Sequence, residues 1–168
     1  IRGITPSVGA FQNFETANVE LFVNASAQFG YLTLKRAFDD INRGAFTGSV
    51  ANPLQLRINK NTLEPTTAVL NASGTNGSLY NAITIYPTLT GLSITGNING
   101  PLIDLNSADF VNFNGALNNT GTTKDLSLTN TSTLNAATTS TLRFIGDASG
   151  NLVRNLNING SSTSATAG

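Results

Sequence analysis

Short apolar stretches alternate with polar ones along most of the chain, and their spacing predicts many short β-strands. From Asn52 onward, apolar side chains tend to occupy every second position within each stretch, which is typical of strands with one buried face. Corners rich in Asn, Gly, Ser and Thr separate the stretches. We expect strands within residues 19–26, 53–60, 67–73, 82–87, 91–100, 101–105, 109–115, 125–130, 140–146 and 151–160.

One stretch has helical spacing instead. In residues 31–44, YLTLKRAFDDINRG, the apolar residues Leu34, Phe38 and Ile41 lie three or four positions apart and form one face of a helix. Gly44 stands where the end of such a helix is expected. Because the apolar stripe is narrow, we expect this helix to cover one end of the strand region, not to form half of a helical bundle.

Two all-β architectures fit this series of strands. Asn-Gly pairs at 76–77, 99–100, 114–115 and 159–160 are hairpin signals and favour an antiparallel sandwich; three of them follow alternating stretches and predict turns with positive φ. An internal repeat favours a parallel β-solenoid, because PLIDLNSADFVNFNG (101–115) and TLRFIGDASGNLVRNLNING (141–160) share the order strand, polar corner, strand, Asn-Gly. The repeat carries two strands and their corners together, so we favour the solenoid.

The composition removes most chemistry from consideration. Only 11% of the 168 residues are charged, and nine basic and nine acidic side chains cancel, so no net field attracts nucleic acid. Cys and His are absent, which excludes disulfides, thiolate nucleophiles and histidine bases or metal ligands. No apolar run reaches the roughly 20 residues of a membrane span. Met is absent even at position 1, so we expect a processed chain or a segment of a longer one.

The remaining acidic residues have a simple structural interpretation. Asp104, Asp109, Asp125 and Asp147 are the carboxylates of the strand region, and Asp109 and Asp147 lie in similar corners of the internal repeat. A corner Asp commonly accepts hydrogen bonds from backbone N–H groups. The serines have no histidine partner, and neither calcium-loop nor phosphate-loop spacing occurs. We therefore expect no catalytic site, no cofactor and no metal.

Several stretches together resemble a known family. YLTLKRAFDDINRGAFTGSV (31–50), the 101–115 stretch and STLRFIGDASGNLVRNLNINGSST (140–163) are similar in order and spacing to a module of large secreted Bacteroidetes (Flavobacterium-type) cell-surface proteins. The resemblance covers roughly residues 19–163. It implies a right-handed parallel β-helix exported to the cell surface, where such proteins serve as adhesins or extracellular structures. Ser107 and Phe113 stand where the family often has Gly and Ile, which alters packing but not chemistry.

We therefore predict an all-β chain that forms a right-handed parallel β-helix (solenoid) with a short N-terminal capping α-helix. Residues 1–18 would be an N-terminal arm, 19–50 a strand plus the capping helix, and 51–168 the β-helix coils with a low-complexity tail. The predicted function is that of a non-enzymatic, adhesive structural protein of the extracellular surface, whose copies join head to tail into a filament. The alternative is a glycan-binding adhesin module or a carbohydrate-active β-helix domain, with Tyr31, Tyr80 and Tyr86 as the tyrosines available for glycan contact.

The predicted assembly contacts lie at the two ends of the chain. Ile1, Ile4, Val8 and Phe11 of the arm would supply a strand or plug to a neighbouring copy. Leu152, Leu156 and Ile158 would belong to the open end that receives it. The predicted partners are therefore copies of the chain itself and surface glycans, with neither nucleic acid nor a membrane span.

Overall fold

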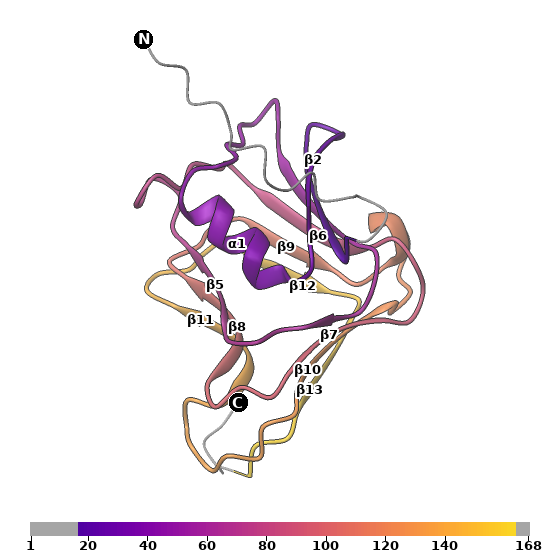
Figure 1. Cartoon of the computed structure of the whole chain (residues 1–168), viewed down its shortest axis with the longest axis vertical. Coiled ribbons are helices and arrows are strands. Elements are labelled where there is room, and N and C mark those ends of the chain that lie inside the picture. Colours follow the sequence, from indigo (N-terminus) through magenta and orange to yellow (C-terminus); the bar gives the residue numbers. More distant parts are fainter. Residues whose placement is uncertain (1–16, 164–168) are drawn as a thin grey trace.

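The computed structural model describes residues 17–163 and consists mostly of short strands with one α-helix (Figure 1). The assembly residues predicted in the arm, Ile1, Ile4, Val8 and Phe11, lie outside the described residues. The strands are β1 (Val19–Val23), β2 (Ser26–Tyr31), β3 (Leu54–Ile58), β4 (Thr62–Leu63), β5 (Ala68–Asn71), β6 (Ile83–Pro87), β7 (Leu92–Gly96), β8 (Pro101–Asn106), β9 (Val111–Asn114), β10 (Leu126–Asn130), β11 (Ser140–Ile145), β12 (Leu152–Arg154) and β13 (Leu156–Gly160). The helix α1 spans Leu34–Asn42, and the short 3-10 helix η2 spans Leu117–Asn119.

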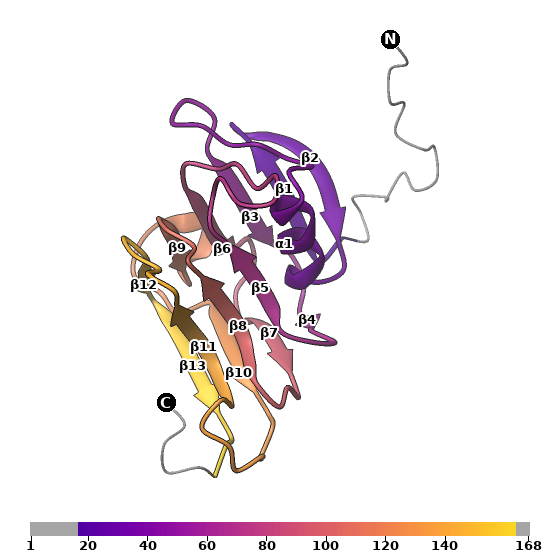
Figure 2. The ribbon, with the colours of Figure 1, turned by 90° about the vertical axis from the view of Figure 1, so that its left-hand side faces the viewer.

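The strands form three sheets. Their strand orders are β12-β9-β6-β3-β1-β2 in the six-stranded sheet, β13-β10-β7-β4 in the four-stranded sheet and β11-β8-β5 in the three-stranded sheet. From β3 onward the chain visits the three sheets in rotation, so each strand pairs in parallel with the strand three elements later. Figure 2 shows the consequence: β1, β2 and α1 lie at one end of the molecule, and β11, β12 and β13 lie at the other.

The prediction of a right-handed parallel β-helix is wrong. The strands form separate sheets and do not close into a solenoid, and the six-stranded sheet is mixed because β1 pairs antiparallel with both β2 and β3. Asn24 and Ala25, with φ of 46° and 64°, reverse the chain after β1 and so create the β1–β2 hairpin. Two successive residues with positive φ suit a tight hairpin, but without a glycine the sequence carries no strong signal for one. The fold is therefore mostly β, with parallel and mixed sheets and one helix.

The predicted helix is present, although it is shorter than the 31–44 stretch. Leu34, Phe38 and Ile41 are fully buried, as their spacing predicted. Thr33 caps the N-terminus of α1 by accepting a hydrogen bond from the Arg36 backbone N–H. Gly44, with φ of 73°, follows the helix where a positive φ favours glycine.

Side chains connect α1 to the sheets beside it. The carboxylate of Glu64 accepts hydrogen bonds from the backbone N–H groups of Leu34 and Lys35, each at 2.9 Å, at the N-terminus of the helix. At the other end of α1, the amide of Asn42 donates to Val69 O and accepts from Asn71 N, both of which belong to β5. The helix thus supplies hydrogen bonds to β5, an edge strand of the three-stranded sheet.

Positive φ was predicted at three of the four Asn-Gly pairs, and this prediction is wrong. The pair at 76–77 has positive φ at both residues, whereas the pairs at 99–100, 114–115 and 159–160 do not. Asn114 instead ends β9, is buried, and accepts a hydrogen bond from Ala116 N through its side chain. Gly115 is required by close packing, because a Cβ there would overlap the carbonyl group of Asn155. Here the asparagine turns the chain through a side-chain hydrogen bond.

Candidate assembly surface at the C-terminal end

The apolar core consists of columns of side chains that pair from strand to strand. Leu70 of β5 pairs with Leu105 of β8, which pairs with Phe144 of β11. The first two are fully buried, but Phe144 is 44% exposed. In the four-stranded sheet, Ile94 and Leu128 are fully buried and Ile158, the last member of their column, is 48% exposed. Within residues 17–163, no further layer therefore covers the core on the side of β11, β12 and β13.

The strand backbone at this end is also left uncovered by the part of the chain that the structure describes. β11, β12 and β13 are each the last strand of a different sheet, and no strand of residues 17–163 pairs with their outer edges. Unpaired N–H and C=O groups on an edge strand are a template for another strand. At the opposite end, α1 lies against β5 and supplies hydrogen bonds to it. We call the surface formed by β11, β12 and β13 the C-terminal end surface.

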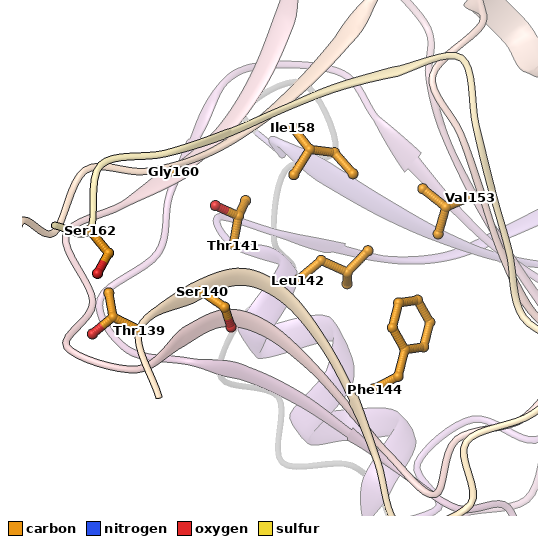
Figure 3. Close-up of a pocket in the computed structure, with 9 residues that line it drawn as sticks. All are labelled: Thr139, Ser140, Thr141, Leu142, Phe144, Val153, Ile158, Gly160 and Ser162. Atoms are coloured by element: carbon orange, nitrogen blue, oxygen red, sulfur yellow. The ribbon is translucent and has the colours of Figure 1, made fainter. Parts of the chain in front are cut away.

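A hollow of about 520 Å³ lies in the C-terminal end surface. Figure 3 shows the side chains of Leu142, Val153 and Ile158 directed toward one another in its middle, with the ring of Phe144 beside them. The other lining residues are small or hydroxyl-bearing: Thr139, Ser140, Thr141, Gly160 and Ser162. No charged side chain of the described residues lines the hollow, so an apolar or backbone-rich occupant fits it better than an ion.

Two hydroxyl groups at the hollow have no hydrogen-bond partner among residues 17–163. Thr139 is 2% exposed, and neither its Oγ1 nor the buried Oγ of Ser140 makes a hydrogen bond there. A buried hydroxyl without a partner costs about 1–3 kcal/mol, so such groups are uncommon in native proteins. Both oxygens are enclosed by residues of the described region, so they are not accessible to an occupant of the hollow.

The three predicted contact residues of the described region occupy different positions. Ile158 lines the hollow, and Leu156 packs against the core as the last member of its column. Leu152 is 47% exposed but pairs with Asn112, one position away from the inward-facing Val153, so it lies outside the hollow. Whether any of them contacts a second copy stays a prediction.

Sequence reasoning missed Leu142, Phe144 and Val153 as members of this surface. Leu142 and Phe144 alternate within 140–146, which predicted a buried face there as in every other strand. The only signal that could have singled them out was their place in the last copy of the internal repeat, because the last layer of a stack has nothing above it.

The carboxylates of the strand region have specific partners. Asp104 binds Arg143 through two hydrogen bonds of 3.0 and 2.7 Å, and this partner raises the pKa of Arg143. Asp109 accepts from Ser149 N and Ser149 Oγ, as expected of a corner residue. Asp109 and Asp147 lie in equivalent corners, between β8 and β9 and between β11 and β12, as predicted, and it is Ser149 of the second corner that bonds to Asp109.

Two further acidic residues occupy turns. Asp125 accepts from Leu117 N and from the hydroxyl of Thr123, which fixes the loop that contains η2. Asp147 has φ of 66° in the corner between β11 and β12. Three of the four carboxylates therefore hold loops and strands in place, and within residues 17–163 no group of three or more His, Cys, Asp or Glu side chains is arranged to hold a metal ion.

The tyrosines considered for glycan contact are buried. Tyr31, Tyr80 and Tyr86 are 5%, 4% and 8% exposed. Their hydroxyls donate to Asp40 Oδ2, Asn71 O and Gln55 Oε1, respectively. Burial raises the pKa of Tyr31 and of Tyr80 well above the usual range, so both remain neutral donors. These side chains do not form an aromatic surface.

No helix within residues 17–163 has the length and apolar character needed to cross a membrane. Comparisons of the chain with protein families, curated proteins and solved structures find no match. The resemblance to the Bacteroidetes surface proteins therefore stays a prediction.

Proposed function

We propose that this protein is a non-enzymatic structural protein whose copies join end to end through the C-terminal end surface, into an extracellular filament. The observation that carries the proposal is that three sheets and their apolar columns end together in one layer, which no other part of residues 17–163 covers. We propose a second copy as the occupant of this surface, because other copies are present wherever the protein is.

The energetics favour covering this layer. Burying the exposed half of Phe144 and of Ile158 is worth about 1 kcal/mol each, since full burial of such a side chain is worth about 1.5–3 kcal/mol. Each backbone hydrogen bond gained along β11, which has six residues, adds about 0.5–1.5 kcal/mol. Several such terms are needed to exceed the cost of association, so a continuous strand pairing is required.

Strand directions support a head-to-tail arrangement. β2 runs parallel to β3 because both pair antiparallel with β1, and β3 runs parallel to β6, β9 and β12. The two outer edges of the six-stranded sheet, β2 and β12, therefore run in the same direction. Copies stacked head to tail would continue one sheet, and contacts of this kind do not close, so they give fibres. The absence of net charge keeps copies from repelling one another.

The proposal is tested by sedimentation and electron microscopy of the purified chain and of two variants. We expect the wild-type chain to form linear assemblies and Ile158→Lys, which places a charge in the hollow, to remain monomeric. Leu89→Lys is the matched control, because Leu89 is 57% exposed in the turn between β6 and β7, away from the C-terminal end surface. Uniform wild-type monomers at high concentration, or assembly of Ile158→Lys equal to that of the wild type, would refute the proposal.

The cell-surface setting rests on the resemblance described above, and the same filaments should be found on the outside of intact cells. Labelling such cells with an antibody against the purified chain tests this part separately. Fluorescence that appears only after the cells are made permeable contradicts it. The buried tyrosines leave the glycan-binding alternative without a specific observation in its favour.

A further inference from the structure

The C-terminal end surface is shaped for an extended strand. Its hollow is bordered mainly by β11, the longest of the three open strands, which supplies Ser140, Thr141, Leu142 and Phe144. The inward column positions on β11 are Leu142 and Phe144, two residues apart. An occupant that continues both columns must therefore place apolar side chains at alternate positions, which is the spacing of a β-strand.

The open edge of β11 gives an independent reason for a strand. No strand of residues 17–163 pairs with the outer edge of β11, so the N–H and C=O groups that point there need partners. A docked helix would not supply them, because a helix uses its backbone groups internally. A strand beside β11 brings free N–H and C=O groups to this edge.

One segment outside the described residues has the required pattern. In ITPSVGA, residues 4–10, the even positions Ile4, Pro6, Val8 and Ala10 are apolar, and the odd positions Thr5, Ser7 and Gly9 are polar or small. Pro6 is compatible with an antiparallel pair in which Val8 lies opposite Phe144, because Pro6 then lies opposite residue 146, beyond the end of β11, where its missing N–H breaks no strand hydrogen bond.

The predicted stacking places this segment close to its binding edge. Residue 17 precedes β1, at the end of the molecule opposite to β11 (Figure 2). In a head-to-tail stack, this end of one copy meets the C-terminal end surface of the next. Sixteen residues precede the described region, and an extended chain covers about 3.3 Å per residue, so residues 4–10 can reach along an edge of that surface.

We propose that residues 4–10 of one copy add as a β-strand to the outer edge of β11 of a neighbouring copy, with Val8 and Ala10 covering the columns that end at Phe144 and Leu142. This inference rests on the proposed end-to-end assembly and names the segment that makes the joint. It retains Ile4 and Val8 of the four arm residues predicted from the sequence and assigns no contact to Ile1 or Phe11.

Cysteine cross-linking tests the register, because the chain has no cysteine of its own. A full-length Val8→Cys chain is mixed with a full-length Phe144→Cys chain under mild oxidation, and linked peptides are identified by mass. Disulfides form when the two Cα atoms lie about 4.4–6.8 Å apart, so we expect a disulfide that joins position 8 of one copy to position 144 of another. Leu89→Cys replaces Phe144→Cys as the control and should give at least tenfold less of the linked product.

Charge substitutions separate this inference from the proposed function. Val8→Lys, on the apolar face of the segment, should reduce assembly at least tenfold, whereas Ser7→Lys, on the opposite face, should assemble as the wild type does. If wild-type chains assemble but Val8→Lys assembles equally well and no disulfide forms between positions 8 and 144, the inference fails and the proposed function stands. If wild-type chains remain monomeric and no such disulfide forms, both fail.

Discussion

Asn130 provides the sharpest test of how the corner before β11 is held. Its side chain is buried, with 1% of its surface exposed. Its Nδ2 lies 3.0 Å from Ile98 O, 2.9 Å from Gly100 O and 2.9 Å from Ser140 O, and its Oδ1 accepts from Ile98 N at 3.0 Å and from Ser132 N at 3.3 Å. One amide thus connects the loop after β7, the loop after β10 and the first residue of β11.

The expected effect of Asn130→Ala follows from this geometry. An amide has two donor hydrogens, so about four hydrogen bonds form at one time, and at roughly 1 kcal/mol each their loss costs about 4 kcal/mol. For a chain of this size, 1 kcal/mol corresponds to about 2–4 °C, so the midpoint of thermal unfolding should fall by about 8–16 °C. Asn130→Asp should cost at least as much at neutral pH, because a carboxylate would face three carbonyl oxygens.

The assay is thermal and urea unfolding followed by circular dichroism. Asn135→Ala is the matched control, because Asn135 lies in the loop that follows Asn130 and is exposed. A loss for Asn130→Ala below about 1 kcal/mol, or equal to that of Asn135→Ala, would contradict the reasoning, since water would then be replacing the amide without cost.

Two further predictions concern Glu64, at the N-terminus of α1, and Gly115, which follows β9 and packs against Asn155. Burial raises the pKa of Glu64 more than the N–H groups of α1 lower it, so the ionised carboxylate is disfavoured in the folded state. The stability of the wild type relative to Glu64→Gln, which cannot ionise, should therefore be greatest below about pH 4 and should fall as the pH rises through the folded-state pKa. Unfolding midpoints measured from about pH 4 to 8 test this. Gly115→Ala should lower the free energy of unfolding by about 1–3 kcal/mol, measured in urea, because its Cβ would overlap the Asn155 carbonyl.

A specific experimental result would contradict each of these two predictions. A wild-type midpoint that tracks that of Glu64→Gln at every pH would show that the carboxyl titrates alike in the folded and unfolded chains. For the glycine, Gly100→Ala is the control, because the nearest atom to a Cβ there is Thr67 Oγ1 at 3.8 Å. Equal effects of the two alanine substitutions would mean that the backbone near Asn155 moves aside.

Much of the secondary structure was predictable because strand and helix spacing are local properties. Leu126 and Leu128 alternate within β10 and are fully buried, and α1 lies inside the stretch with helical spacing. The sequence did not predict β2, whose residues SAQFGY lack regular apolar alternation. It also joined β12 and β13 into one strand, because nothing marks Asn155, whose φ of 55° separates them.

Ile158 was predicted as a member of the open end, but the hollow was not. Leu142, Phe144 and Val153 have the same local pattern as buried residues in earlier strands. Their exposure depends on which strand is last in each sheet, and pairing between segments more than 30 residues apart decides this. The sequence by itself therefore determined which faces are apolar, since side-chain spacing is set within a few residues. Only the tertiary structure decided that β1 and β2 form a hairpin, that the sheets stay separate, and that the apolar columns of the three sheets end without a covering layer from residues 17–163, since these depend on backbone pairing between distant segments.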